Sequence, residues 1–230
     1  MTPMLPRSAT SAEAGTGRLF TACLDAVCAE LQRRESELCA LDRAIGDGDH
    51  GANLARAAHA LLDAKQELSA LPLASALERA GVLVVMTVGG ASGPLYGSFL
   101  MALGRSWPLQ PTPHAISGAL EEAVAAVGRR GRSTEGEKTM LDVLVPAARA
   151  FRESTSVGFN SLSSAMASML AAADDGFEAA RPLRATKGRA AYVGERSIGH
   201  LDPGAASARL CLHVVARVVS DQCQRQELAP

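Results

Sequence analysis

The chain has 230 residues, a formal net charge of −1, 47% apolar residues and 3% aromatic residues. This length and apolar content allow one sizeable domain with a buried core, whereas the balanced charge excludes proteins that bind nucleic acid by neutralising its phosphates. Because β-sheets are enriched in aromatic and β-branched residues, a core built from Ala, Leu, Val and Met favours closely packed helices.

The N-terminal residues 1–17 are rich in Ser, Thr, Ala, Gly and Pro. We expect them to form a flexible leader ahead of one helical domain over residues 18–230. The leader lacks the apolar stretch of a signal peptide, and no later segment reaches ~18 uninterrupted apolar residues. We therefore expect a soluble, cytoplasmic protein that does not bind a membrane.

Apolar residues recur at helical spacing along most of the chain. The apolar run 82–86 would suit a buried strand by composition, but it has no partner strand nearby and is assigned to the end of a helix. Asp202 can cap the last helix, and Pro203 fits its first position. The spacing predicts an all-α domain of eight helices, over residues 19–41, 52–68, 73–86, 94–105, 114–127, 139–152, 162–180 and 203–219.

The five cysteines indicate neither a disulfide framework nor a zinc site. Their number is odd, and no pair has the spacing Cys-x-x-Cys. Three of them fall at apolar positions of predicted helices, where we expect small core residues.

The loop after the first predicted helix is rich in aspartate and glycine. It reads Asp42-Arg43-Ala44-Ile45-Gly46-Asp47-Gly48-Asp49-His50-Gly51. Three carboxylates within eight residues repel one another unless a cation lies among them, and glycines let the backbone fold around an ion. Oxygen ligands without a Cys or His cluster indicate Mg²⁺ or Ca²⁺. The alternative is a solvated acidic turn, in which Asp and Gly are common.

Two known motifs are excluded for this loop. Gly46, Gly48 and Gly51 match the dinucleotide fingerprint G-x-G-x-x-G, but that motif follows a strand, and here a long amphipathic helix precedes it. Its two aspartates would also repel a pyrophosphate in the absence of a metal. An EF-hand loop would need further oxygen ligands and a closing Glu, whereas Gly51 is followed by Ala, Asn, Leu, Ala and Arg.

Three further segments place glycine and polar residues between predicted helices and at the start of the helix that follows: residues 89–94, 131–142 and 187–204. The first leads small residues into a helix N-terminus, where backbone N–H groups bind phosphate, although a plain interhelical turn is the alternative. Cations in the last segment can meet phosphate charge, although a single surface cation is usually just solvated. Loops gathered at one end of a helical scaffold are a place where a site is built. The residues alone therefore predict a helical, divalent-metal-dependent binder of a phosphorylated ligand.

Together the four segments resemble the L subunit, the ADP-binding subunit, of dihydroxyacetone kinases. The resemblance spans residues 19–219 and rests on four motifs. They are Asp-Arg-x-Ile-Gly-Asp-x-Asp-His-Gly, Gly-Gly-Ala-Ser-Gly-Pro, Gly-x-Lys-Thr-Met-x-Asp-Val and Lys-Gly-Arg-Ala-x-Tyr-x-Gly-Glu-Arg-Ser-x-Gly-His-x-Asp-Pro-Gly-Ala. The resemblance implies an up-and-down barrel of eight antiparallel helices, with the Mg-nucleotide at one end.

The resemblance also implies the site residues. Two Mg²⁺ ions between the phosphates of ADP or ATP are held by Asp42, Asp47 and Asp49. The nucleotide is contacted after the metal loop and at the phosphate turn by His50, Gly51, Ala52, Asn53, Ala91 and Ser92. The adenine side, the phosphates and the closing segment are assigned to Gly131, Met140, Arg189, Asp202, Pro203 and Gly204. Phosphoryl transfer needs positioning and charge neutralisation, so we name no catalytic residue.

A division of labour follows from the same resemblance. A separate K subunit binds dihydroxyacetone covalently through a histidine, and the L subunit, active only with this partner, brings the γ-phosphoryl group to it. Where a phosphotransferase-type M subunit is present, ADP stays bound and is rephosphorylated in place; in other kinases ATP exchanges freely. Two alternatives stay open: a nucleotide-sensing module that binds a transcription regulator but not nucleic acid directly, and the L subunit of a kinase for a related ketose such as erythrulose.

Overall fold

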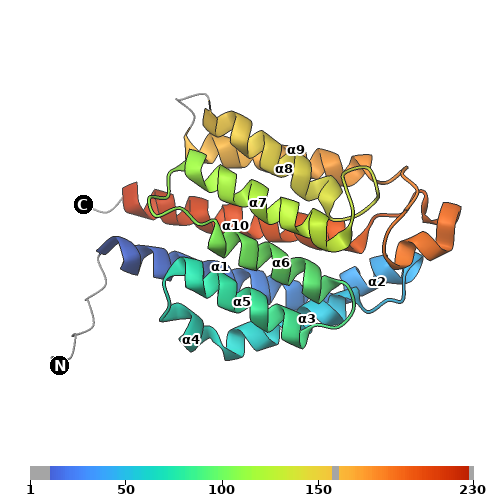
Figure 1. Ribbon diagram of the computed structural model, residues 1–230, viewed down its shortest axis with the longest axis horizontal. Helices are drawn as coiled ribbons and strands as arrows, with labels where there is room; N and C mark the ends of the chain where they lie inside the picture. The colour runs from blue at the N-terminus through green and yellow to red at the C-terminus, as the bar shows by residue number, and fades with distance from the viewer. Residues whose placement is uncertain (1–10, 157–160, 228–230) are drawn as a thin grey trace.

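The computed structural model describes residues 11–156 and 161–227, and every regular element in these ranges is a helix (Figure 1). The α-helices are α1 Ser11–Arg33, α2 Glu35–Ile45, α3 His50–Asp63, α4 Lys65–Ser69, α5 Leu73–Thr87, α6 Ser92–Arg105, α7 Pro113–Gly131, α8 Leu141–Ser156, α9 Leu162–Ala179 and α10 Pro203–Glu227. A 3-10 helix, η1, spans Arg189–Ser197. The predicted all-α class is confirmed, and residues 82–86 form part of α5. None of the described helices is both long and apolar enough to span a membrane.

The order of neighbouring helices in space closes on itself. Helices α5 to α9 each pack against the next in the chain, α10 lies between α9 and α1, and α3 lies between α1 and α5. Within the described residues, eight helices thus contact one another in a closed order, α1, α3, α5, α6, α7, α8, α9 and α10. The short helix α4 packs on α1 and α5, and α2 contacts α3, α10 and η1.

The four motif-bearing segments gather at one end of the molecule. In Figure 1 the loops between α2 and α3, α5 and α6, α7 and α8, and α9 and α10 all lie at the right-hand end. The first turn of α1 and the last turn of α10 lie at the opposite end. The helical scaffold therefore brings together segments that are far apart in the sequence.

Two predicted helices are each divided by a single residue. The stretch 19–41 is interrupted at Arg34 (φ −96°, ψ 8°), and the stretch 52–68 at Ala64 (φ −87°, ψ 2°). These angles lie in the sparsely allowed region between helix and strand. Arg and Ala are both good helix formers, so the residue types give no signal of either break. The break at Arg34 matters because it starts α2, the helix that carries Asp42.

Other boundaries also differ from the prediction, and α10 runs on to Glu227, beyond the predicted end at residue 219. Helix α1 begins at Ser11, so residues 11–17 of the predicted leader are helical, and the rest of that leader lies outside the described residues. The stretch between the predicted helices 162–180 and 203–219 contains η1, which no helix prediction covered, with a positive φ of 59° at Gly194 inside it. The start of α10 at Pro203 agrees with the prediction.

The core consists of several clusters of small and medium-sized side chains. The largest lies among α7, α8, α9 and α10 and includes Val127, Leu144 and Phe151. A second joins α1, α3 and α5 and includes Cys28, which is 1% exposed, as expected for a small core residue. All five cysteines are free thiols. Small side chains also allow close helix contacts: a Cβ on Gly51 would lie 2.0 Å from the carbonyl oxygen of Glu35, so the start of α3 can approach α2 only with glycine at this position.

Candidate functional site

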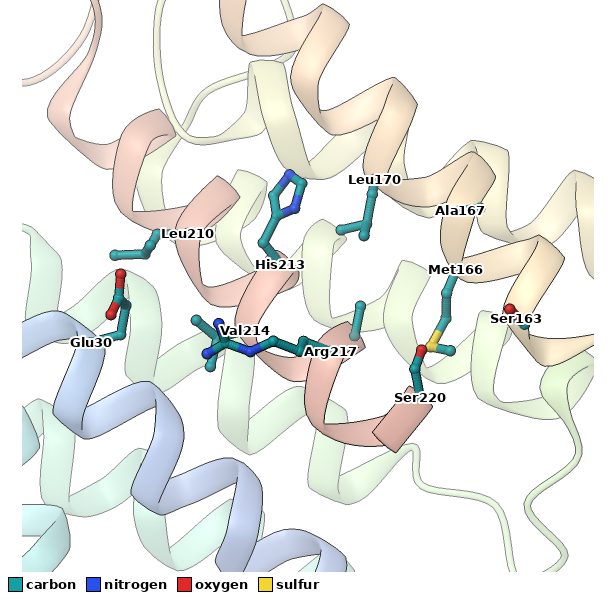
Figure 2. Close-up of a pocket in the computed structure, with 11 residues that line it drawn as sticks. Glu30, Ser163, Met166, Ala167, Leu170, Leu210, His213, Val214, Arg217 and Ser220 are labelled. Carbon is teal, nitrogen blue, oxygen red and sulfur yellow. The ribbon is translucent and has the colours of Figure 1, made fainter. Parts of the chain in front are cut away.

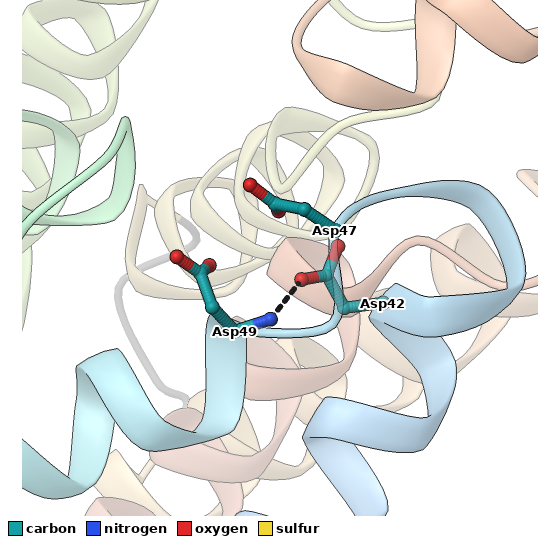
Figure 3. A group of neighbouring side chains, drawn as sticks. All are labelled: Asp42, Asp47 and Asp49. Carbon is teal, nitrogen blue, oxygen red and sulfur yellow. Dashed lines mark hydrogen bonds between the residues drawn. The ribbon is translucent and has the colours of Figure 1, made fainter.

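Three aspartates gather around the loop between α2 and α3 (Figure 3). Asp42 lies in the last turn of α2, Asp47 in the loop, and Asp49 directly before α3. One carboxylate oxygen from each lies within 4.8 Å of the other two. Asp42 is buried, whereas Asp47 and Asp49 are exposed. The three predicted metal ligands thus share one region that is open to solvent on one side.

Backbone hydrogen bonds orient the Asp42 carboxylate. Its Oδ2 atom accepts hydrogen bonds from the N–H groups of Asp49 (2.8 Å) and His50 (3.1 Å). Its Oδ1 atom occupies the space beside Gly46, where a Cβ would come within 2.1 Å of it. Glycine is therefore needed at position 46 to admit the carboxylate. Because all candidate donors are carboxylate oxygens within a few ångströms of one another, the residues fit a hard divalent cation such as Mg²⁺.

Arg189, the first residue of η1, lies beside this cluster. Its Nη2 atom is 3.0 Å from Oδ2 of Asp47, and its side chain is 69% exposed. An ion pair this exposed contributes about 0–1 kcal/mol, because water screens it. The guanidinium can therefore exchange a carboxylate partner for a phosphate at small cost.

The turn between α5 and α6 lies next to the start of α3. A Cβ on Gly89 or Gly90 would lie 3.8 Å from the side-chain amide of Asn53, which is itself buried. Ala91 is exposed, and Ser92 is the first residue of α6. The first N–H groups of a helix have no partner within it and bind anions well. The structure thus places the predicted phosphate turn against the helix that follows the metal loop.

His50 connects this turn to α10 through a chain of hydrogen bonds. Its Nδ1 atom is 3.1 Å from Oγ of Ser92, and its Nε2 atom is 2.8 Å from Oγ of Ser207. The Ser207 hydroxyl also contacts the Tyr96 hydroxyl (2.7 Å) and donates to the carbonyl of Gly204 (3.1 Å). Burial lowers the pKa of His50, against the opposing effect of nearby carboxylates, and burial raises the pKa of Tyr96 well above its ordinary value. Ser207 and Tyr96 were not predicted as site residues.

The segment between α7 and α8 is held by two buried charged side chains. The Asp142 carboxylate accepts hydrogen bonds from the N–H groups of Gly136 and Thr139, both at 2.6 Å. Lys138 is 1% exposed, and its ammonium donates to the carbonyls of residues 180, 181 and 183, which directly follow α9. Burial lowers its pKa. Each hydrogen bond from a charged donor contributes about 1.5–3 kcal/mol. Lys138 therefore anchors the segment to α9 and is not available to a ligand.

The remaining predicted residues lie around the start of α10. Asp202 caps this helix by accepting a hydrogen bond from the Ala205 N–H (2.7 Å). Its pKa is raised to about 7, mainly by burial and also by the charge of Asp142. Met140 is 4% exposed and belongs to the largest core cluster, and a Cβ on Gly204 would lie 3.6 Å from the Met140 Cβ.

Four other predicted residues take part mainly in packing. A Cβ on Gly131 would lie 3.3 Å from Leu95 of α6. Gly51 packs on α2, and the Ala52 N–H donates to the sulfur of Cys39 (3.3 Å). Pro203 is buried in the first turn of α10. These residues shape the same end of the molecule.

A groove of about 430 Å³ lies elsewhere, among α1, α9 and α10 (Figure 2). The residues that line it include Glu30, Met166, His213, Val214 and Arg217. His213 contacts the carboxylate of a neighbouring aspartate on α9 at 2.7 Å. None of the predicted site residues lines this groove. The candidate site is therefore the open end of the molecule around the three aspartates.

Comparisons with known proteins find a matching domain family and similar subunits of bacterial dihydroxyacetone kinases. Residues 44–217 match the DAK2 domain family. The chain is 38% identical over 190 residues to the ADP-binding subunit DhaL of PEP-dependent dihydroxyacetone kinase 1 from Listeria innocua, covering 80% of this chain and 88% of that protein. It is 33% identical over 192 residues to the corresponding subunit from Escherichia coli, covering 82% of this chain and 91% of that protein.

Longer proteins match over one part of their length. The mouse triokinase/FMN cyclase is 34% identical over 215 residues, covering 93% of this chain and 37% of that protein. A crystal structure of the dihydroxyacetone kinase from C. freundii in complex with AMP-PNP and Mg²⁺ superposes with a TM-score of 0.67 and 24% identity, covering 94% of this chain and 37% of that one. At this identity the superposition shows a shared fold.

Proposed function

The chain belongs to the DAK2 domain family, and from this membership we propose that it is the ADP-binding subunit of a dihydroxyacetone kinase. In this role it holds ADP or ATP with Mg²⁺ and passes a phosphoryl group to a ketose held by a separate K subunit. The observation that carries the proposal is the cluster of Asp42, Asp47 and Asp49 at the start of α3, with one carboxylate oxygen from each within 4.8 Å of the other two.

The aspartates, the start of α6 and Arg189 would each bind the phosphates in a different way. Asp42, Asp47 and Asp49 would hold Mg²⁺, which when bound neutralises and orients phosphate oxygens. The first N–H groups of α6 would donate to the phosphates, and Arg189 would add an exposed positive charge. Phosphoryl transfer depends mainly on such positioning and charge neutralisation, so this chain needs no nucleophile of its own.

The names of the bacterial relatives support two partner subunits for this chain, one that carries the acceptor and one that supplies the phosphoryl group. The proteins from Listeria innocua and Escherichia coli are subunits of PEP-dependent dihydroxyacetone kinases, and a Lactococcus lactis relative is named PTS-dependent. We therefore propose a K subunit as the acceptor-carrying partner and a phosphotransferase-type M subunit as the source of the phosphoryl group. In that arrangement ADP stays bound and is rephosphorylated in place.

The direct test of nucleotide binding is thermal stabilisation. With Mg²⁺ and ADP at about 100 times Kd, binding adds about 2.7 kcal/mol to the free energy of unfolding. In a domain of this size we expect the Tm to rise by roughly 5–10 °C. Differential scanning calorimetry with ADP, with and without EDTA, measures this shift. EDTA should remove it; a shift that persists in EDTA would show that the nucleotide does not bind through a metal.

Arg189 is expected to act on turnover more than on binding. In an assay with the K partner, we predict that Arg189→Ala lowers kcat by about 10–100-fold, because a guanidinium near the phosphates meets charge that grows in the transition state. Asn53→Ala should lower kcat less. The Asn53 amide contributes to nucleotide binding equally in the ground state and in the transition state, so its loss should weaken binding more than it slows turnover. Arg181→Ala is the matched control, because Arg181 is also exposed and also pairs with one carboxylate, that of Glu178. Equal kcat values for wild type and Arg189→Ala would remove Arg189 from the mechanism.

A further inference from the structure

A chain of side-chain hydroxyls and one imidazole joins three helices at the nucleotide end. It runs from Tyr96 on α6 to Ser207 on α10, then to His50 on α3 and back to Ser92 at the start of α6. Ser207 is fully buried, at 0% exposed, and His50 is 8% exposed. Tyr96 packs against three of the apolar clusters, so its ring is held in place while its hydroxyl reaches Ser207.

Counting hydrogens fixes the direction of every bond in this chain. Ser207 has one hydroxyl hydrogen, and its bond to the Gly204 carbonyl uses that hydrogen because a carbonyl can only accept. The Ser207 oxygen must then accept from the Tyr96 hydroxyl and from an Nε2–H group of His50. A neutral imidazole protonated on Nε2 has a free acceptor at Nδ1, which takes the hydroxyl hydrogen of Ser92. One tautomer of His50 therefore satisfies all four hydrogen bonds at once.

We infer that Ser207 is a positioning residue of the nucleotide site, and that Tyr96 supports it. Ser207 holds His50 in the form protonated on Nε2, and His50 in turn holds Ser92, so the phosphate turn keeps a fixed place relative to the metal loop. This inference rests on the proposed function, because the turn and the loop are its phosphate and metal sites.

The geometry explains why one hydroxyl can have this effect. Ser207 contacts both His50, which directly follows the metal-loop aspartate Asp49, and Gly204, which lies in the segment that closes the site. Through His50 it also reaches Ser92, the first residue of α6. With the Ser92 hydroxyl hydrogen committed to His50, the backbone N–H groups of the first turn of α6 are the donors left for phosphate.

The matched control for Ser207 is Ser117 on α7. Both are fully buried helical serines at 0% exposed, and both donate to the carbonyl three residues earlier, Ser117 to that of His114 at 2.7 Å. Ser117→Ala therefore removes the same local hydrogen bond without touching His50. Tyr96→Phe is a second, milder variant, which removes one donor to Ser207 and keeps the aromatic ring.

Two readouts separate positioning from stability. The ¹⁵N signals of the His50 ring, assigned with a His50→Gln variant and recorded without nucleotide, report which ring nitrogen carries the proton. Calorimetric titration with Mg-ADP gives Kd.

For Ser207→Ala we expect the two ring signals to move towards averaged values and Kd to rise by about tenfold, because the buried donors of His50 and Tyr96 lose their acceptor. For Tyr96→Phe we expect a rise of about threefold, since one of the same hydrogen bonds is lost. Ser117→Ala should lower the Tm, although less than Ser207→Ala because it leaves no buried donor without an acceptor, and should keep the ring signals and Kd at wild-type values.

The outcomes distinguish this inference from the proposed function. Wild-type protein that fails to bind Mg-ADP would overturn the proposed function, whereas the ring signals still test the link between Ser207 and His50. Wild-type ring signals in Ser207→Ala would overturn the inference even if Mg-ADP binds. An equal rise in Kd for Ser117→Ala would also overturn it, because the effect would then come from general destabilisation. Should Ser207→Ala not fold, wild-type Kd and ring signals in Tyr96→Phe would count against the inference.

Discussion

Replacing Asp47 or Asp49 with alanine is expected to abolish Mg-dependent ADP binding while the helical fold stays intact. Changing residues around a metal's direct ligands already costs about 10–100-fold in affinity, so losing a ligand should weaken binding by more than roughly 100-fold. The fold should tolerate both changes because neither aspartate supports it. Asp49 precedes α3 without a side-chain capping bond, and Asp47 makes one exposed ion pair. Removing one carboxylate also relieves repulsion within the cluster when no metal is bound.

Calorimetric titration with Mg-ADP measures the loss, and circular dichroism checks the fold. Asp175→Ala is a suitable control, because Asp175 is an exposed aspartate on α9. It should bind Mg-ADP as the wild type does. Wild-type affinity in both Asp47→Ala and Asp49→Ala would show that the three carboxylates do not form the metal site.

The fold class was predictable because the composition and the apolar spacing agree. Few aromatic residues and helical periodicity both indicate helices, and Asp202 followed by Pro203 marks the start of α10 correctly. The breaks at Arg34 and Ala64 were not predictable from residue type, since both residues favour helix. They depend on packing instead: α2 has to leave the direction of α1 for Gly51 to contact its first turn.

The candidate site was predictable where its residues are close in sequence. Asp42, Asp47 and Asp49 fall within eight residues, and a cation between them is a local expectation. The supporting residues were missed because their partners are distant. Ser207 and His50 are 157 positions apart, and a serine among alanines at the start of a helix carries no local signal of such a contact. Lys138 was seen as part of a polar loop, yet its ammonium is buried against the end of α9.

The proposed assignment as one subunit of a kinase predicts an all-or-none dependence on a partner. Every candidate residue that we identify lies at the nucleotide end of the helices, and the acceptor ketose belongs to the K subunit in the proposed arrangement. The isolated chain is therefore expected not to phosphorylate dihydroxyacetone, and adding the K partner should restore turnover. With that partner, Asp47→Ala should stay inactive, because it lacks the metal-bound nucleotide, whereas Asp175→Ala should be active.

The measurement that tests this account most directly is the formation of dihydroxyacetone phosphate by purified proteins. The chain alone, the K partner alone and the two together are each supplied with dihydroxyacetone and Mg²⁺. The phosphoryl donor is either ATP or phosphoenolpyruvate with the phosphotransferase proteins. We predict product only when both chains are present, with phosphoenolpyruvate as the effective donor. Appreciable product from the isolated chain, or none from the two together with either donor, would contradict the assignment.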